Sequence, residues 1–234
     1  MNSQTNFILT TLYSKANPKN VEGMKRFGIE STDKMLGIST PFLQSLKKSI
    51  GINHELALEL WQTGIFEARV LAAFIADPKQ VTRPLMNRWV HDFDNWAICD
   101  GVCLHCFRRT MHGHGVIPSW TKQQSEFVRR AGFSMMATLA VGDKKSVDAV
   151  FLAYLPIIKK YSTDERNFVK KAVNWALRQI GKRNLKLNTA AIKTAKEIRK
   201  SDSPAAKWIA ADALRELQSP AVQKRLHTRV QHAI

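Results

Sequence analysis

The spacing of apolar residues constrains this 234-residue chain most, because it is helical almost throughout. Apolar side chains recur at every third or fourth position, a pattern typical of amphipathic helices, whereas strands show strict alternation. Breakers such as Asn17-Pro18 and Asp77-Pro78 separate the helical stretches at short intervals. The pattern predicts an all-α protein of about twelve helices, each of roughly 10 to 18 residues. The clearest stretches are 7–12, 43–50, 56–61, 70–75, 127–141, 147–158, 168–180 and 208–217.

Several helix starts carry recognisable signals. Thr40-Pro41 and Ser203-Pro204 each place a capping residue before a proline, which is suited to the first helical position. The segment 162–165 predicts a third start, with an acidic first turn.

Short helices joined by short connections form antiparallel pairs. A period of roughly 40 residues predicts that these pairs stack as a HEAT-like repeat solenoid, which presents a long concave surface. A compact helical bundle without repeats is the alternative. No linker or low-complexity segment interrupts the chain, so we expect a single domain over residues 1–234.

The charge is large and unevenly distributed. The chain carries +17, yet residues 1–100 hold 11 Lys/Arg against 10 Asp/Glu, and residues 101–234 hold 25 against 9. We expect a basic concave face that binds a polyanion, in the first place nucleic acid. Ribosomal, heparin-binding and membrane-peripheral proteins also have basic surfaces, so charge alone leaves these classes open.

The sequence shows neither a membrane span nor a signal peptide, and this bears on the cellular compartment we expect. There is no apolar run of the roughly 18 residues that a membrane span requires, and the start does not resemble a signal peptide. An odd number of cysteines, three, lies between Cys99 and Cys106, which argues against a secreted disulfide framework. We expect a cytoplasmic, nucleoid-associated protein.

Three segments could carry chemistry. In 94–100, Trp96 and Asp100 are four residues apart and share one helix face. In 170–178, Trp175 and Arg178 lie one turn apart, preceded by two lysines, and 127–131 contains a basic pair. Each has an ordinary structural interpretation, since tryptophans usually pack in cores and single charges are usually solvated.

Together these segments resemble the AlkD family of alkylpurine DNA glycosylases, which have a HEAT-like fold. The family's Trp-x-x-x-Asp segment matches Trp96 and Asp100, and its Ala-x-x-Trp-x-Leu-Arg segment matches residues 172–178. An Arg-Ala helix opening matches Arg130, and residues 24–27 and 36–41 are similar to the family's N-terminal motif. The chain departs from the family at Phe27 and Ser39, where tyrosine and glutamine are common.

The resemblance implies a monofunctional glycosylase that removes cationic N3- or N7-alkylated purines from double-stranded DNA, with the lesion left stacked. It implies catalytic roles for Asp100, Trp96 and Trp175, no cofactor, and a monomer. The residues expected to contact DNA are Arg130, Arg129, Arg178, Lys170, Lys171, Phe27 and Ser39.

Two other functions compete with this prediction. A non-catalytic HEAT-like scaffold would keep the basic face but would have no use for a carboxylate within it. A zinc site could use Cys99, Cys103 and Cys106 with neighbouring histidines. Their spacing places the cysteines on one helix face, as in a buried helix, so we expect no metal. His112 and His114, in a glycine-rich loop, are expected at the surface near phosphate.

Overall fold

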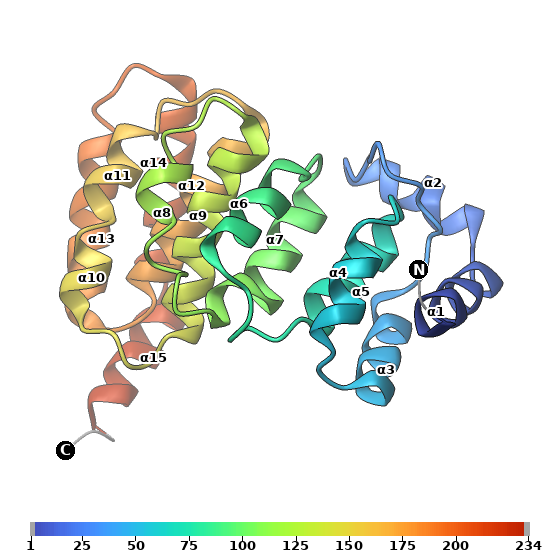
Figure 1. Cartoon of the computed structure of the whole chain (residues 1–234). Helices are drawn as coiled ribbons and strands as arrows, with labels where there is room; N and C mark the ends of the chain where they lie inside the picture. The colour runs from blue at the N-terminus through green and yellow to red at the C-terminus, as the bar shows by residue number, and fades with distance from the viewer. Residues whose placement is uncertain (1–2, 232–234) are drawn as a thin grey trace. The chain divides into compact units, whose positions relative to one another are not determined.

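A computed structural model describes residues 3–231, which form helices joined by turns and loops (Figure 1). Within this range the β-structure consists of one isolated bridge, between Lys34 and Ile65. The predicted all-α class is therefore confirmed. The helices are α1 (Ser3–Ser14), α2 (Pro18–Arg26), α3 (Thr40–Ile50), α4 (His54–Trp61), α5 (Phe66–Ile75), α6 (Arg83–His91), α7 (Trp96–His105), α8 (Ile117–Trp120), α9 (Glu126–Gly142), α10 (Asp148–Leu152), α11 (Leu155–Lys160), α12 (Asn167–Gly181), α13 (Leu185–Ile198), α14 (Pro204–Leu217) and α15 (Pro220–Gln231), with a 3₁₀ turn at Phe107–Arg109.

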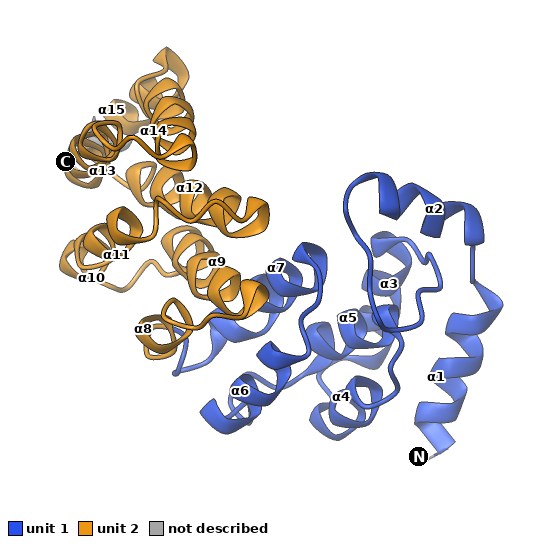
Figure 2. Cartoon of the chain, turned by 90° about the horizontal axis from the view of Figure 1, so that it is seen from above, with its two compact units in different colours: residues 1–113 blue, residues 114–234 orange. Residues whose placement is uncertain are grey.

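The chain divides into two compact units, residues 1–113 and 114–234 (Figure 2). The single domain over 1–234 stays a prediction. No helix of the described residues is long and apolar enough to cross a membrane.

Unit 1 is built around α5, which packs against α3, α4 and α7. Its core includes two fully buried indoles, Trp61 and Trp89, stacked with their ring centroids 4.0 Å apart. Burying aromatic rings of this size removes a large apolar area from water and fixes how the helices pack. The N-terminal half of the chain thus has its own core.

Unit 2 repeats one arrangement of paired helices. In one row α12 packs against α9 and α14, and in the other α13 packs against α10 and α11. Neighbouring segments of this unit approach closely at two glycines, Gly181 and Gly132. A Cβ atom on Gly181 would lie 2.7 Å from a methyl group of Leu217, and one on Gly132 would lie 2.7 Å from Cγ2 of Thr121. Stacked helix pairs of this kind are the repeating element of HEAT-like proteins.

The structure corrects some predicted helix boundaries. The stretch 147–158 divides into α10 and α11 because Pro156, at the second position of α11, lacks an amide hydrogen and disfavours a continuous helix before it. The prediction at 162–165 was wrong, since α12 begins only at Asn167.

The two proline-led caps turned out differently. Ser203 caps α14 by accepting a hydrogen bond from the amide of Ala206 at 3.2 Å, as predicted. At α3 the cap lies one residue earlier than predicted, at Ser39, and its hydroxyl makes no capping bond.

Candidate nucleic-acid site

The candidate catalytic helix α7 starts from a capped and tethered turn. Asn95 accepts hydrogen bonds from the amides of Ala97 and Ile98 at 3.0 and 3.1 Å, which satisfies groups that a helix start leaves without partners. The side-chain amide of Asn95 donates a hydrogen bond to one carboxylate oxygen of Asp94 at 2.8 Å. The second oxygen of Asp94 accepts from the hydroxyl of Ser31 at 2.8 Å and from the backbone amide of Thr32 at 2.5 Å. The segment before α7 is therefore fixed to a loop more than sixty residues earlier in the chain.

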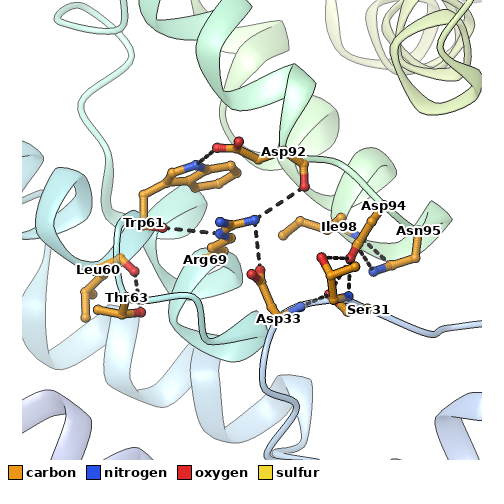
Figure 3. A network of polar contacts seen from close by, with 11 residues as sticks. Ser31, Asp33, Leu60, Trp61, Thr63, Arg69, Asp92, Asp94, Asn95 and Ile98 are labelled. Carbon is orange, nitrogen blue, oxygen red and sulfur yellow. Dashed lines mark hydrogen bonds and ion pairs between the residues drawn. The ribbon is translucent and has the colours of Figure 1, made fainter.

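A second set of contacts, which involves Arg69 of α5 and Trp61 of α4, holds the same turn (Figure 3). Arg69 forms an ion pair of 2.8 Å with Asp33 and donates to the carbonyl of Asp92 at 3.3 Å. The indole of Trp61 donates to the carboxylate of Asp92 at 2.7 Å. Burial raises the pKa of Asp33, and nearby carboxylates add to the increase, although the guanidinium of Arg69 opposes it. The network fixes the turn that directly precedes Trp96, the first residue of α7.

Trp96 is fixed by its own hydrogen bond. Its indole Nε1 donates to the backbone carbonyl of Phe27 at 3.0 Å. That carbonyl lies at the end of α2, where Gly28 adopts a positive φ of 69°. The amides of Gly28 and Ile29 bond back to the carbonyls of Lys25 and Met24, a Schellman ending that favours glycine. The N-terminal motif and the Trp-x-x-x-Asp segment are thus in direct contact.

Asp100 lies one turn after Trp96 on α7 and is half-buried. Partial burial is suited to electrostatic catalysis, because fixed charges interact more strongly where water is partly excluded. Its role in catalysis remains a prediction.

A cavity of about 540 Å³ borders this helix within unit 1. Ala97 and Gly101, the sequence neighbours of Trp96 and Asp100, belong to its wall. Phe27, a residue that is 74% exposed, and Ser39 also belong to the wall. Sequence reasoning identified these two positions but not the cavity, because its walls come from four helices that are distant in the chain.

A substitution at Gly101 tests whether the face of α7 that lines the cavity is open or packed. A Cβ atom there would meet no atom within 4 Å, and glycine inside a helix costs about 0.5–1 kcal/mol relative to alanine. We expect Gly101→Ala to raise the free energy of unfolding by about that amount, measured by urea denaturation. Gly132→Ala is the matched control and should destabilise, because its Cβ would clash with Thr121. A destabilised Gly101→Ala protein would show that this face of α7 is packed rather than open.

In unit 2, Trp175 lies half-buried on α12, one turn before Arg178. Arg178 forms ion pairs with Glu216 at 2.5 Å and Asp212 at 3.5 Å. Burial alone would raise the pKa of Asp212, but a hydrogen bond from Asn174 and the charge of Arg178 outweigh it and hold that pKa below its usual range. The charge of Arg178 is therefore largely balanced by carboxylates of α14.

The predicted basic pair on α9 is engaged in contacts within unit 2. Arg130 is only 6% exposed, and its guanidinium donates to the carbonyl of Phe168 at 2.5 Å. Arg129 pairs with Asp164 at 2.7 Å and lies over the ring of Tyr161. Arg130 thus joins α9 to the first turn of α12, and Arg129 joins it to the segment that precedes α12. A contact of either with phosphate remains a prediction.

The two lysines at the start of α12 are more accessible. Lys171 is exposed, and Lys170 lies with its ammonium 5.4 Å from the ring centroid of Trp208. Such a cation–π contact orients a lysine without neutralising its charge.

His114, in the glycine-rich loop, is held by two side chains of unit 2. The side chain of His114 is 33% exposed, and its two ring nitrogens lie 2.5 Å from the hydroxyl of Tyr154 and 2.7 Å from the carboxylate of Asp143. A position of His114 near phosphate stays a prediction. Hydrogen bonds from Ser146 and His114 hold the pKa of Asp143 well below normal, although burial opposes them.

The side chains of Cys99, Cys103 and Cys106 are fully buried thiols that are not joined in disulfides. Burial raises the pKa of Cys106 to about 12 and keeps it protonated. Among the described residues, no three His, Cys, Asp or Glu side chains form a group suited to a metal ion.

Comparison with known proteins defines the class first and then the family. A solved structure described as "a new family of proteins related to the HEAT-like repeat DNA glycosylases with affinity for branched DNA structures" superposes with a TM-score of 0.74 at 22% identity. The match covers 91% of this chain and 95% of that one, so the fold is HEAT-like. The family model of the DNA alkylation repair enzymes matches residues 8–217. The chain therefore belongs to the DNA alkylation repair enzyme family. No curated protein sequence matches it significantly.

Proposed function

We propose that this protein is a monofunctional DNA glycosylase that hydrolyses the N-glycosidic bond of cationic N3- or N7-alkylated purines in double-stranded DNA. It would act as a cytoplasmic, nucleoid-associated monomer without a cofactor. The observation that carries the proposal is the half-buried Asp100, one turn after a tryptophan whose ring is held by the carbonyl of Phe27. Membership of the DNA alkylation repair enzyme family supports it.

The chemistry requires little from the protein. Alkylation at N3 or N7 leaves the purine cationic, so the base departs without being protonated. The remaining barrier is the positive charge that develops on the deoxyribose as the bond breaks. A fixed carboxylate stabilises that charge and orients the attacking water. Indole faces attract cations through their quadrupole, which is the role proposed for Trp96 and Trp175.

The direct test is to incubate the protein with duplex DNA that carries 7-methylguanine and to measure the free base by chromatography. Release at a rate above spontaneous depurination supports the proposal. No release, in a preparation that binds the same duplex, contradicts it.

The charge of the lesion provides a sharper prediction. If leaving-group protonation is not part of the mechanism, a neutral damaged base should be a poor substrate. We expect release of 7-methylguanine or 3-methyladenine and negligible release of hypoxanthine or uracil from otherwise identical duplexes. Efficient hypoxanthine release, abolished by substituting a histidine such as His105 or His112, would show acid-assisted catalysis and contradict the mechanism.

A second candidate is a protein that binds DNA without excising a base. The structural neighbour favours it, because that protein is described by its affinity for branched DNA. Tight binding of a four-way junction together with no release of 7-methylguanine would support this candidate.

A further inference from the structure

A second cavity, of about 500 Å³, lies within unit 2 where the ends of α9 and α12 meet the start of α13 and the middle of α15. Four of its eight lining residues are cationic, and none is acidic. A concave site with several converging cations suits a phosphate group better than it suits an apolar ligand. The lining residues are Ala140, Val141, Lys144, Gln179, Lys182, Arg183, Asn184 and Arg225.

Two of the four cations form a fixed base for this cavity. Arg183 donates to the carbonyls of Ala140 and Asp143 at 2.7 and 2.6 Å, and its guanidinium lies 3.9 Å from the ring centroid of Phe151. Lys182 forms an ion pair of 2.5 Å with Glu216. These contacts hold the side chains in place, so a ligand would meet a preorganised surface.

The other two cations, Lys144 and Arg225, are exposed at the rim. Among the described residues no carboxylate lies within ion-pair distance of either one. Their charges remain available to an anion. Asn184, which also lines the cavity, caps the 14-residue helix α13, whose start adds a partial positive charge.

The cavity continues a line of residues along α12. Lys171, Trp175, Arg178 and Lys182 recur at spacings of four, three and four, so they follow one helix face. A rise of about 1.5 Å per residue separates Lys171 from Lys182 by roughly 16 Å. The cavity is therefore at the far end of the face that bears the proposed catalytic Trp175.

We infer that this cavity binds a phosphate of the DNA backbone, at the end of the α12 face opposite Lys170 and Lys171. The inference rests on the proposed DNA-binding function and adds a contact that none of the predicted site residues provides. Lys144 and Arg225 would neutralise the phosphate from the rim, with Lys182 and Arg183 at its base.

The test compares Lys144→Ala/Arg225→Ala with a matched double variant, Lys193→Ala/Lys196→Ala. The control removes the same charge from exposed positions of α13 that do not line the cavity. Affinity for an undamaged duplex would be measured by fluorescence anisotropy over a range of salt concentrations. A phosphate contact contributes about 0.9 to the slope of log K against log salt. We expect the cavity variant to reduce the slope by about 1 and the control to leave it nearly unchanged. Equal changes in both variants, or none in the cavity variant, would overturn the inference.

A second measurement separates DNA from free phosphate as the source of the anion. In calorimetric titration with inorganic phosphate, we expect no saturable binding to the wild type or to the variant. Saturable binding that the cavity variant loses would assign the site to a small anion and overturn the inference. Single-turnover release of 7-methylguanine should be the same in the wild type and in the control variant Lys193→Ala/Lys196→Ala, whose altered positions do not line the cavity. This result keeps a failure of the phosphate site distinct from a failure of the proposed glycosylase.

Discussion

Replacing Asp100 with asparagine should reduce the release of 7-methylguanine by about 100- to 1000-fold, the usual cost of removing one electrostatic stabiliser of a transition state. Asparagine keeps the shape of the side chain and loses only its charge. Affinity for the duplex should be unchanged or slightly higher, because a carboxylate repels phosphate. Single-turnover excision and anisotropy binding on the same preparation measure the two effects separately.

The control for this variant is Asp202→Asn. Asp202 is a fully exposed carboxylate in the turn before α14, and its partner Lys207 is 3.6 Å away. Excision by this variant should match the wild type. If Asp100→Asn excised at nearly the wild-type rate, Asp100 could not be the catalytic group, and the non-catalytic DNA-binding candidate would gain support.

The second large effect concerns stability. Glu67 is buried in α5, and its carboxylate accepts hydrogen bonds from three backbone amides, those of Leu36, Gly37 and Ile38, at 2.8, 2.6 and 3.3 Å. Glu67→Ala would leave all three amides buried without an acceptor. Each unsatisfied group costs about 1–3 kcal/mol, so the free energy of unfolding should fall by at least about 3 kcal/mol.

Chemical denaturation followed by circular dichroism would measure this loss. Glu22→Ala is the control, since Glu22 is an exposed carboxylate in a surface ion pair with Lys25 and should change stability by less than about 0.5 kcal/mol. A Glu67→Ala protein as stable as the wild type would mean that the segment 36–38 finds other acceptors.

The segment 36–38, which Glu67 binds, also shows why the N-terminal motif contains a glycine at position 37. Gly37 has a φ of 72°, and a Cβ there would lie 2.3 Å from the carbonyl oxygen of Asn17. The amide of Asn17 in turn donates to the carbonyl of Leu36 at 2.7 Å. This glycine is required by a close approach of two backbone segments, and it fixes the loop that leads to Ser39 and α3.

The sequence by itself determined the helical class, since a helical apolar period extends over most of the chain and no long alternating stretch competes with it. It also placed Trp96 and Asp100 on one helix, because four residues make little more than one turn and need no tertiary information. The Ser203-Pro204 cap was predicted for the same reason, as a signal contained within four residues.

Only the tertiary structure decided how the charged side chains are used. Arg130 and Arg178 are cations in any sequence count, yet one is buried against the carbonyl of Phe168 and the other is paired with two carboxylates of α14. Their partners lie 34 to 38 residues away, and the periodicity of a single helix carries no information about such contacts. The same holds for the cavity beside α7 and for the cluster formed by Lys144 and Arg225, because the packing of several helices creates each of them.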